Sequence, residues 1–224
     1  MTLELPRPKF ISFDVYGTLI HFQMREAVTP LLADRITGDD LEVFLRRFRT
    51  YRYDEILEYR PYDVVLDRAF RRACEESGIE ARDTDVGTIL DAVLTWGPHA
   101  DVPAALRTMA DHFPLVALSN ADKRHLDASI PKLGAPFRRV ISAEEAGAYK
   151  PRVRAFHYML ETLDAEPADF LHIAAHQIYD HIPMHDLGFT NKVYLDRGYE
   201  PDLPQYGAVR VTSLDEVNRA LGIA

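Results

Sequence analysis

The sequence predicts an α/β protein with a doubly wound, mostly parallel sheet and a helical cap inserted after the first strand. Two observations carry this prediction. Short apolar runs of strand type alternate with helical patterns along the chain, and one interval between strands is far longer than a single crossover helix needs. The six runs are Phe10–Phe13, Leu115–Leu118, Arg139–Ile141, Leu171–Ala174, Lys192–Leu195 and Ala208–Val211.

The long interval runs from His21 to Phe113, and its apolar residues recur at helical spacing. We therefore expect a Rossmann-like catalytic core made of residues 1–21 and 97–224, and a helical cap subdomain at residues 22–96. We expect the cap to cover the carboxyl edge of the sheet, which is where open α/β sheets bind their ligands.

Composition excludes several classes of partner. The 224 residues are 47% hydrophobic and 27% charged, which is ordinary for a globular protein. A net charge of −9 without a long Lys/Arg run argues against nucleic-acid or membrane partners. The single cysteine, Cys74, suits a reducing compartment. The first residues lack a signal-peptide core, and no apolar run approaches roughly 18 residues. We therefore expect a cytoplasmic protein.

The first strand ends in a carboxylate. Asp14 directly follows Phe10–Phe13, and a turn with Gly17 and Thr18 comes next. Because ligands bind beyond the carboxyl ends of parallel strands, Asp14 is expected at the mouth of a site. A carboxylate in that place is a candidate nucleophile that forms a covalent ester. The alternative is an aspartate that only caps a turn.

One predicted cap helix carries arginines beside an apolar stripe. Gly38-Asp39-Asp40 supplies its stop and N-cap. At about 100° per residue, Arg52 falls inside the stripe and Arg46 points away. A cation on an apolar face needs an acidic partner or an anion. The stripe is formed by Leu41, Phe44, Leu45, Phe48 and Tyr51, with Arg47 and Arg49 at its borders and Asp54, Glu55 and Glu58 as acidic candidates.

Four segments, in order, resemble the motifs of the haloacid dehalogenase superfamily over essentially the whole chain. The resemblance implies that Asp14 is the nucleophile, that Lys150 opens a helix and pairs with Asp14, and that Asp180 orients the hydrolytic water. Members are often homodimers, although the sequence leaves the oligomeric state open. The segments are Phe10–Thr18, Leu118-Ser119-Asn120, Tyr149-Lys150-Pro151 and Leu171–Gly188.

The residue at position 16, here a tyrosine, distinguishes branches of this superfamily. Its phosphatases carry a second aspartate at that position as general acid, whereas a tyrosine with an unperturbed pKa of about 10 is a poor proton donor. Tyr16 resembles the L-2-haloacid dehalogenase (type II) branch. That resemblance implies a cofactor-free hydrolase of small 2-haloalkanoic acids, with a small-molecule carboxylate as substrate. Phe48-Arg49 resembles the aromatic–Arg pair of the dehalogenase cap, so resemblance favours Arg49 as anion ligand and periodicity favours Arg52.

The remaining site residues include departures from the family pattern. Thr18 and Ser119 are expected to donate hydroxyl hydrogen bonds, and Asn120 to contact the leaving halide. Ala175, His176 and Gln177 stand where dehalogenases show Ser and Asn, and Phe156 stands where they show Tyr. Gln177 can replace an amide and His176 can act as base or polar wall, but Ala175 cannot replace a hydroxyl.

These departures keep other functions open. A Mg²⁺-dependent phosphatase would use Asp14 and Asp180 as metal ligands. A metal-free hydrolase of another activated carbon and a non-catalytic binding module also remain. We expect no metal site from His172, His181 and His185, because no third ligand stands at a defined zinc spacing.

Overall fold

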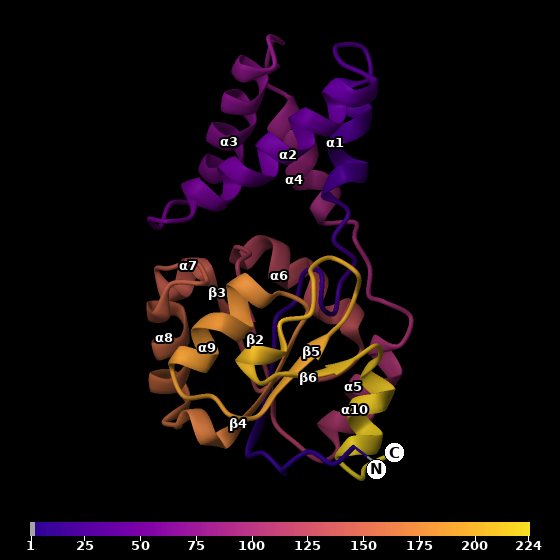
Figure 1. The fold of residues 1–224 in the computed structure, drawn as a ribbon, viewed down its shortest axis with the longest axis vertical. Coiled ribbons are helices and arrows are strands. Elements are labelled where there is room, and N and C mark those ends of the chain that lie inside the picture. The colour runs from indigo at the N-terminus through magenta and orange to yellow at the C-terminus, as the bar shows by residue number, and fades with distance from the viewer. Residues whose placement is uncertain (1–2) are drawn as a thin grey trace. The chain divides into compact units, whose positions relative to one another are not determined.

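The computed structural model describes residues 3–224, so Met1 and Thr2, at the start of the expected core segment 1–21, lie outside the described residues. The chain divides into two compact units. The first combines residues 3–21 with Gly97–Ala224, and the second is Phe22–Trp96. The first unit holds the sheet and the second is built from helices (Figure 1).

The first unit contains one six-stranded sheet of order β3-β2-β1-β4-β5-β6, and all five neighbouring pairs are parallel. Every strand lies within one residue of its predicted bounds, so the predicted fold class is confirmed. The strands are β1 (Phe10–Phe13), β2 (Leu115–Ser119), β3 (Arg139–Ser142), β4 (Phe170–Ala174), β5 (Lys192–Leu195) and β6 (Val209–Val211).

Helices cover both faces of this sheet, because parallel strands are joined by crossover connections. Helices α5 and α10 lie on one side, and α8 and α9 lie on the other (Figure 1). The helices are α5 (Val102–Ala110), α6 (Lys123–Ser129), α7 (Ala143–Ala146), α8 (Val153–Leu163), α9 (Ile182–Asp186) and α10 (Leu214–Ala220). A single π-helical turn, Gln177–His181, connects β4 to α9.

The strand order creates a switch point between β1 and β4. From β1 the chain adds β2 and β3 on one side, and it then crosses over to add β4, β5 and β6 on the other. In open α/β sheets the crevice at the carboxyl ends of such strands is the ligand site. Asp14 directly follows β1 there, and the π turn begins three residues after the last residue of β4.

An aromatic cluster anchors the central strands. Phe10 of β1 stacks on Phe170 of β4 with ring centroids 5.3 Å apart, and Phe189 packs 5.9 Å from Phe170. Phe156 of α8 is fully buried in the same cluster. The phenyl ring at position 156 therefore belongs to the core that supports the site, and an apolar residue suits that environment.

The second unit is a helical bundle. The rings of Phe44, Phe48 and Phe70 make edge contacts at 5.5 and 5.6 Å in its core. A buried ion pair joins Arg35 to Asp85 at 2.7 Å. Its helices are α1 (Met24–Leu32), α2 (Gly38–Glu55), α3 (Tyr62–Glu76) and α4 (Asp85–Val93).

The predicted start of α2 needs a correction. Thr37, with extended backbone, is the N-cap residue, and the helix begins at Gly38. Asp39 and Asp40 therefore lie in the first turn and not at the cap. Carboxylates in that turn face the positive end of the helix dipole, which explains why acidic residues stand there.

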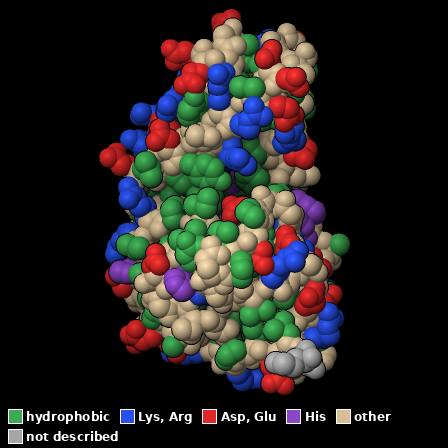
Figure 2. Space-filling view, in the orientation of Figure 1, with side chains coloured by type: hydrophobic (Ala, Val, Ile, Leu, Met, Phe, Trp, Pro, Cys, Tyr) green, Lys and Arg blue, Asp and Glu red, His purple; other side chains and the backbone are tan. Residues whose placement is uncertain are grey.

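Charged side chains of both signs are interspersed over the face of each unit that Figure 2 shows. Between residues 3 and 224, no helix is both long and apolar enough to cross a membrane.

We predict that Phe156→Ala lowers the free energy of unfolding by about 3–5 kcal/mol, because it empties a fully buried ring position. Val153, on the same helix and 50% exposed, is the matched control, and Val153→Ala should change the value by less than about 0.5 kcal/mol. Urea unfolding followed by circular dichroism measures both. Equal falls in the free energy of unfolding for Phe156→Ala and Val153→Ala would contradict this description of the core.

Candidate active site

Asp14 is held by two different donors, one on each carboxylate oxygen. Thr18 donates its hydroxyl to Asp14 Oδ2 at 2.7 Å, and Lys150 donates to Asp14 Oδ1 at 2.9 Å. The Thr18 oxygen in turn accepts the backbone N–H of Ala175 at 2.9 Å. Asp14 is only 5% exposed. The carboxylate is therefore fixed in one orientation at the end of β1.

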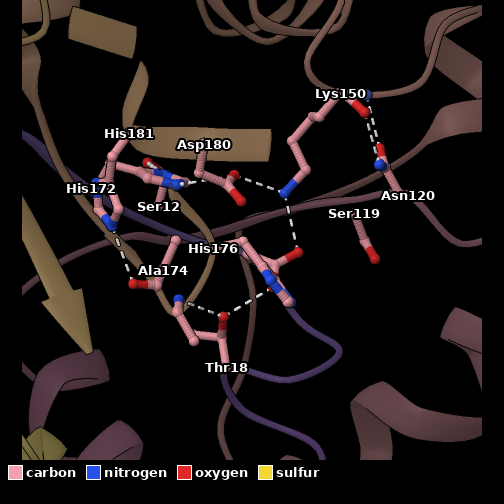
Figure 3. A network of polar contacts seen from close by, with 12 residues as sticks. Ser12, Thr18, Ser119, Asn120, Lys150, His172, Ala174, His176, Asp180 and His181 are labelled. Carbon is pink, nitrogen blue, oxygen red and sulfur yellow. Dashed lines mark hydrogen bonds and ion pairs between the residues drawn. The ribbon is translucent and has the colours of Figure 1, made fainter. Parts of the chain in front are cut away.

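Lys150 lies between two carboxylates (Figure 3). Its ammonium contacts Asp14 Oδ1 at 2.9 Å and Asp180 Oδ1 at 2.6 Å, and the side chain is 1% exposed. Lys150 precedes α8, which starts at Val153, so it stands in the turn before the helix and does not open it. The lysine thus joins the turn between α7 and α8 to the switch point.

The charges in this cluster reinforce one another. Burial lowers the pKa of Lys150, but the carboxylates of Asp14 and Asp180 outweigh burial and raise the pKa overall. Burial alone would raise the pKa of Asp180, but the Lys150 ammonium and a hydrogen bond from His172 hold it well below its ordinary value. Lys150 is therefore a cation and Asp180 an anion at neutral pH.

Asn120 holds the backbone of Lys150. Its side-chain carbonyl accepts the Lys150 N–H at 2.7 Å, and its amide donates to the Lys150 carbonyl at 2.8 Å (Figure 3). Ser119 is the last residue of β2, and its hydroxyl oxygen accepts the Ala121 N–H at 3.3 Å. The expected roles of Asn120 at the halide and Ser119 at a carboxylate stay predictions.

The Tyr16 hydroxyl is anchored to the α6 segment. It donates to the His125 carbonyl at 3.1 Å and lies 2.7 Å from the Ser129 hydroxyl. The ring is thereby fixed two residues after Asp14, where the sequence predicted a substrate-contacting group.

His176 links the nucleophile turn to the β5–β6 loop. Its Nδ1 lies 3.3 Å from Glu200 Oε1, and its Nε2 lies 3.3 Å from the Tyr16 carbonyl oxygen. The backbone at Gly17 has φ +93°, and a Cβ there would lie 2.7 Å from His176 Nε2. Only glycine fits this close approach.

The protonation of His176 follows from its partners. Burial lowers the pKa of the imidazole, but the hydrogen bond with Glu200 and the charge of Asp14 outweigh burial and raise it overall. A protonated imidazole donates from both nitrogens. This geometry favours a role in positioning the Tyr16–Gly17 turn over the predicted alternative of a general base.

Gln177 begins the π turn and is fully buried. Its backbone N–H donates to Glu200 Oε2 at 2.6 Å. Among residues 3–224, neither side-chain amide atom of Gln177 has a hydrogen-bond partner, and the same holds for Asp180 Oδ2. π turns often occur at functional sites, and this one carries Asp180, whose Oδ1 lies 2.6 Å from Lys150 Nζ.

The predicted anion ligands Arg49 and Arg52 lie on α2 in the second unit. Arg49 is exposed. Arg52 is half-buried, as its place in the apolar stripe predicted, and its guanidinium lies over the rings of Phe22 and Phe48 at 5.5 and 5.0 Å. The acidic candidates pair with other arginines: Asp54 with Arg72, Glu55 with Arg60 and Arg68, and Glu58 with Arg60. Anion binding by Arg49 or Arg52 stays a prediction.

The three histidines near the fourth motif have separate partners. His172 contacts Ser12 and Asp180, His181 contacts the Ala174 carbonyl at 3.0 Å, and the His185 ring packs 5.6 Å from that of Tyr206. Within residues 3–224, no group of three His, Cys, Asp or Glu side chains is placed to hold a metal ion.

Sequence reasoning missed two partners of the site. Glu200 lies in the loop after β5, where no motif marks it. Ser12 meets His172 only because β1 and β4 pair with these residues in register. A polar residue inside an apolar strand was the one available signal for Ser12, and the sequence offered no such signal for Glu200.

We predict that Glu200→Gln destabilises the protein in a pH-dependent way. The raised pKa of His176 adds stability that is present below its ordinary value of 6.5 and is lost as the pH rises through the raised value. The lowered pKa of Glu200 adds stability that is present above its ordinary value of 4.5 and is lost at lower pH.

The difference in unfolding free energy between wild type and Glu200→Gln should therefore be largest between these two ordinary values and shrink in alkali. Urea unfolding across pH 4 to 9 measures it. Glu161→Gln is the control, because the Arg154–Glu161 pair is exposed on both sides and such pairs contribute little. If the difference in unfolding free energy between wild type and Glu200→Gln does not vary with pH, the pairing of His176 with Glu200 is refuted.

Comparison with known proteins identifies the family of the chain. The family model of haloacid dehalogenase-like hydrolases matches residues 8–174. The (S)-2-haloacid dehalogenase H-109 of Pseudomonas putida is 27% identical over 188 residues, which cover 80% of this chain and 82% of that protein.

Two solved structures share the fold. A dehalogenase with an intermediate complex superposes with a TM-score of 0.79 at 21% identity, covering 96% of this chain and 97% of the other. YfnB from Bacillus subtilis, bound to magnesium, superposes with a TM-score of 0.80 at 18% identity, covering 97% and 100%. The matched segment includes Asp14, Thr18 and Lys150. The chain belongs to the haloacid dehalogenase-like hydrolase family.

Proposed function

We propose that this hydrolase removes halide from small 2-haloalkanoic acids through an ester on Asp14, giving a 2-hydroxy acid. The observation that carries the proposal is the pairing of a fixed Asp14–Lys150 ion pair with a tyrosine two residues after the nucleophile. An aligned carboxylate can displace halide from carbon, and a halide leaves without a proton. Tyr16 cannot supply the carboxylic acid that a phosphate ester's leaving oxygen needs.

The first step is an in-line attack by an Asp14 oxygen on C2 of the substrate. The new C–O bond forms as the C–halogen bond breaks, and the bonding electrons leave with the halide. Lys150 and Thr18 hold the Asp14 carboxylate in one orientation, so little freedom is lost on reaching the transition state.

The second step is hydrolysis of the ester. Water attacks the carbonyl carbon of Asp14, the hydroxy acid leaves, and Asp14 is regenerated with release of a proton to solvent. Asp180 is ionised and lies 2.6 Å from the same lysine, so it can orient the attacking water. The substrate carbon is attacked only once, in the first step, and its configuration is therefore inverted.

The similarity to the (S)-2-haloacid dehalogenase of Pseudomonas putida supports this choice of substrate. The fold does not, since magnesium-bound YfnB has the same architecture. A magnesium-dependent phosphatase therefore remains the second candidate function.

The donor set of this site suits a metal poorly. Among residues 3–224, Asp14 and Asp180 are the carboxylates of the site that converge on one point, and the Lys150 ammonium already occupies that point at 2.9 and 2.6 Å. The Tyr16 carbonyl oxygen, another hard ligand nearby, faces His176 Nε2. A divalent ion between the two carboxylates would meet a fixed positive charge, so no step is assigned to a metal.

We predict that purified protein releases chloride from one enantiomer of 2-chloropropionate, that EDTA leaves the rate unchanged, and that Asp14→Asn abolishes release. An amide is not nucleophilic enough to form the ester. Chloride electrode or colorimetric assays follow the reaction. The exposed Asp111 supplies the control, and Asp111→Asn should keep wild-type activity.

The same preparation is assayed with p-nitrophenyl phosphate and Mg²⁺. Phosphate release that EDTA stops, without chloride release, would replace the dehalogenase with the phosphatase. If neither chloride nor phosphate is released, the search would turn to substrates with other activated carbon centres.

A further inference from the structure

We propose that His172, with Ser12 behind it, is a positioning residue that fixes the Asp180 carboxylate for hydrolysis of the ester. This inference rests on the proposed function. It concerns only the second step of that reaction.

The three residues form a hydrogen-bonded chain that runs from two paired strands to the π turn (Figure 3). Ser12 of β1 and His172 of β4 are paired neighbours in the parallel ladder, so their side chains project to the same face. The Ser12 hydroxyl lies 2.9 Å from His172 Nδ1, and His172 Nε2 lies 3.2 Å from Asp180 Oδ1. All three side chains are fully buried.

The partners define the protonation of His172. An ionised carboxylate only accepts hydrogen bonds, so Nε2 must carry the proton that reaches Asp180. Burial lowers the pKa of the imidazole and keeps it neutral despite Asp180. Nδ1 is then an acceptor, and Ser12 donates its hydroxyl to it. Ser12 therefore selects the tautomer that points an N–H at Asp180.

The two carboxylate oxygens of Asp180 differ in the hydrogen bonds that they accept. Oδ1 accepts from both Lys150 at 2.6 Å and His172 at 3.2 Å. Within the described chain Oδ2 has no hydrogen-bond partner. Two donors from different directions prevent the carboxylate from rotating, so Oδ2 is the oxygen that can orient a water molecule.

The hydrogen bonds from Ser12 through His172 to Asp180 also explain how this site can function with an alanine at position 175. That residue has no side-chain donor and contributes only its backbone N–H, which goes to Thr18 at 2.9 Å. His172 reaches Asp180 from within β4, three residues before Ala175. Besides Lys150, the polar support for Asp180 therefore comes from His172 in the strand interior and not from the side chain of Ala175 in the loop after β4.

The test separates the two chemical steps. His172→Leu removes the N–H donor, whereas His172→Gln keeps an N–H at similar reach. A misplacement of about 1 Å can slow a step by about a hundredfold, so we expect a tenfold or greater fall in kcat for His172→Leu, with most of it restored by His172→Gln. Ser12→Ala should give a smaller fall, because His172 stays but its tautomer is no longer fixed.

The pattern of the constants distinguishes positioning from general damage. Because kcat/KM for 2-chloropropionate reports ester formation when halide departure is irreversible, it should stay near wild type in His172→Leu. The KM should fall together with kcat. A burst of about one chloride per enzyme should precede the slow phase, and mass spectrometry of quenched samples should find the ester on the Asp14 peptide.

His181→Leu is the matched control. His181 is also fully buried, its ring lies 6.2 Å from that of His172, and it bonds a backbone carbonyl in place of Asp180. The His181→Leu variant should hydrolyse the ester at the wild-type rate per folded molecule, even if its thermal stability is lower.

Three outcomes overturn the inference. They are wild-type ester hydrolysis in His172→Leu, a fall in kcat/KM as large as that in kcat, and equal slowing in His181→Leu. If His172→Leu does not fold, His172→Gln and Ser12→Ala provide the test. A fall in kcat in His172→Gln that equals or exceeds the fall in Ser12→Ala would refute the role of His172 as a hydrogen-bond donor. No chloride and no ester in the wild type would instead remove the proposed function, and this inference with it.

Discussion

The buried ammonium of Lys150 is the interaction on which the candidate site depends. A lysine that is 1% exposed is tolerated only because two carboxylates lie within 2.9 Å of its nitrogen. Those carboxylates come from the ends of β1 and β4, the two strands at the centre of the sheet. Removing either acid would leave an unbalanced buried charge, so fold stability and site geometry share the same three groups.

The strand order converts distant residues into neighbours. Asp14, Lys150 and Asp180 follow three different strands, and parallel pairing brings all three strand ends to one edge. Glu200 and Asn120 then fix the surrounding turns, one through His176 and the other through the backbone of Lys150. The chemistry is carried by loops, while the sheet sets where those loops meet.

Much of this could be predicted from sequence, because the informative signals are local. A four-residue apolar run followed by Asp14 marks both a strand and the end at which a ligand binds. The motif order also brought together Asp14, Thr18, Lys150 and Asp180, and the structure places these four in contact. The predicted α2 cap within Gly38-Asp39-Asp40 was wrong, because Thr37 adopts the extended backbone that a cap requires and the helix already begins at Gly38.

Other features depend on contacts that no local pattern encodes. The bond between Ser12 and His172 needs the register of β1 against β4, and residue spacing within either strand cannot supply it. Asn120 was expected at the halide, yet its amide makes two hydrogen bonds to Lys150, a partner 30 residues away. The charged partner of His176 lies in a loop after β5, where composition is uninformative.

The most direct test of the ester mechanism is a single turnover in H₂¹⁸O with enzyme in excess over 2-chloropropionate. Water attacks the Asp14 carbonyl carbon in this mechanism, so one heavy oxygen should appear in the Asp14 peptide by mass spectrometry, and the hydroxy acid should carry none. Label in the product hydroxyl with an unlabelled Asp14 would mean that water attacks the substrate directly, and it would contradict Asp14 as the nucleophile.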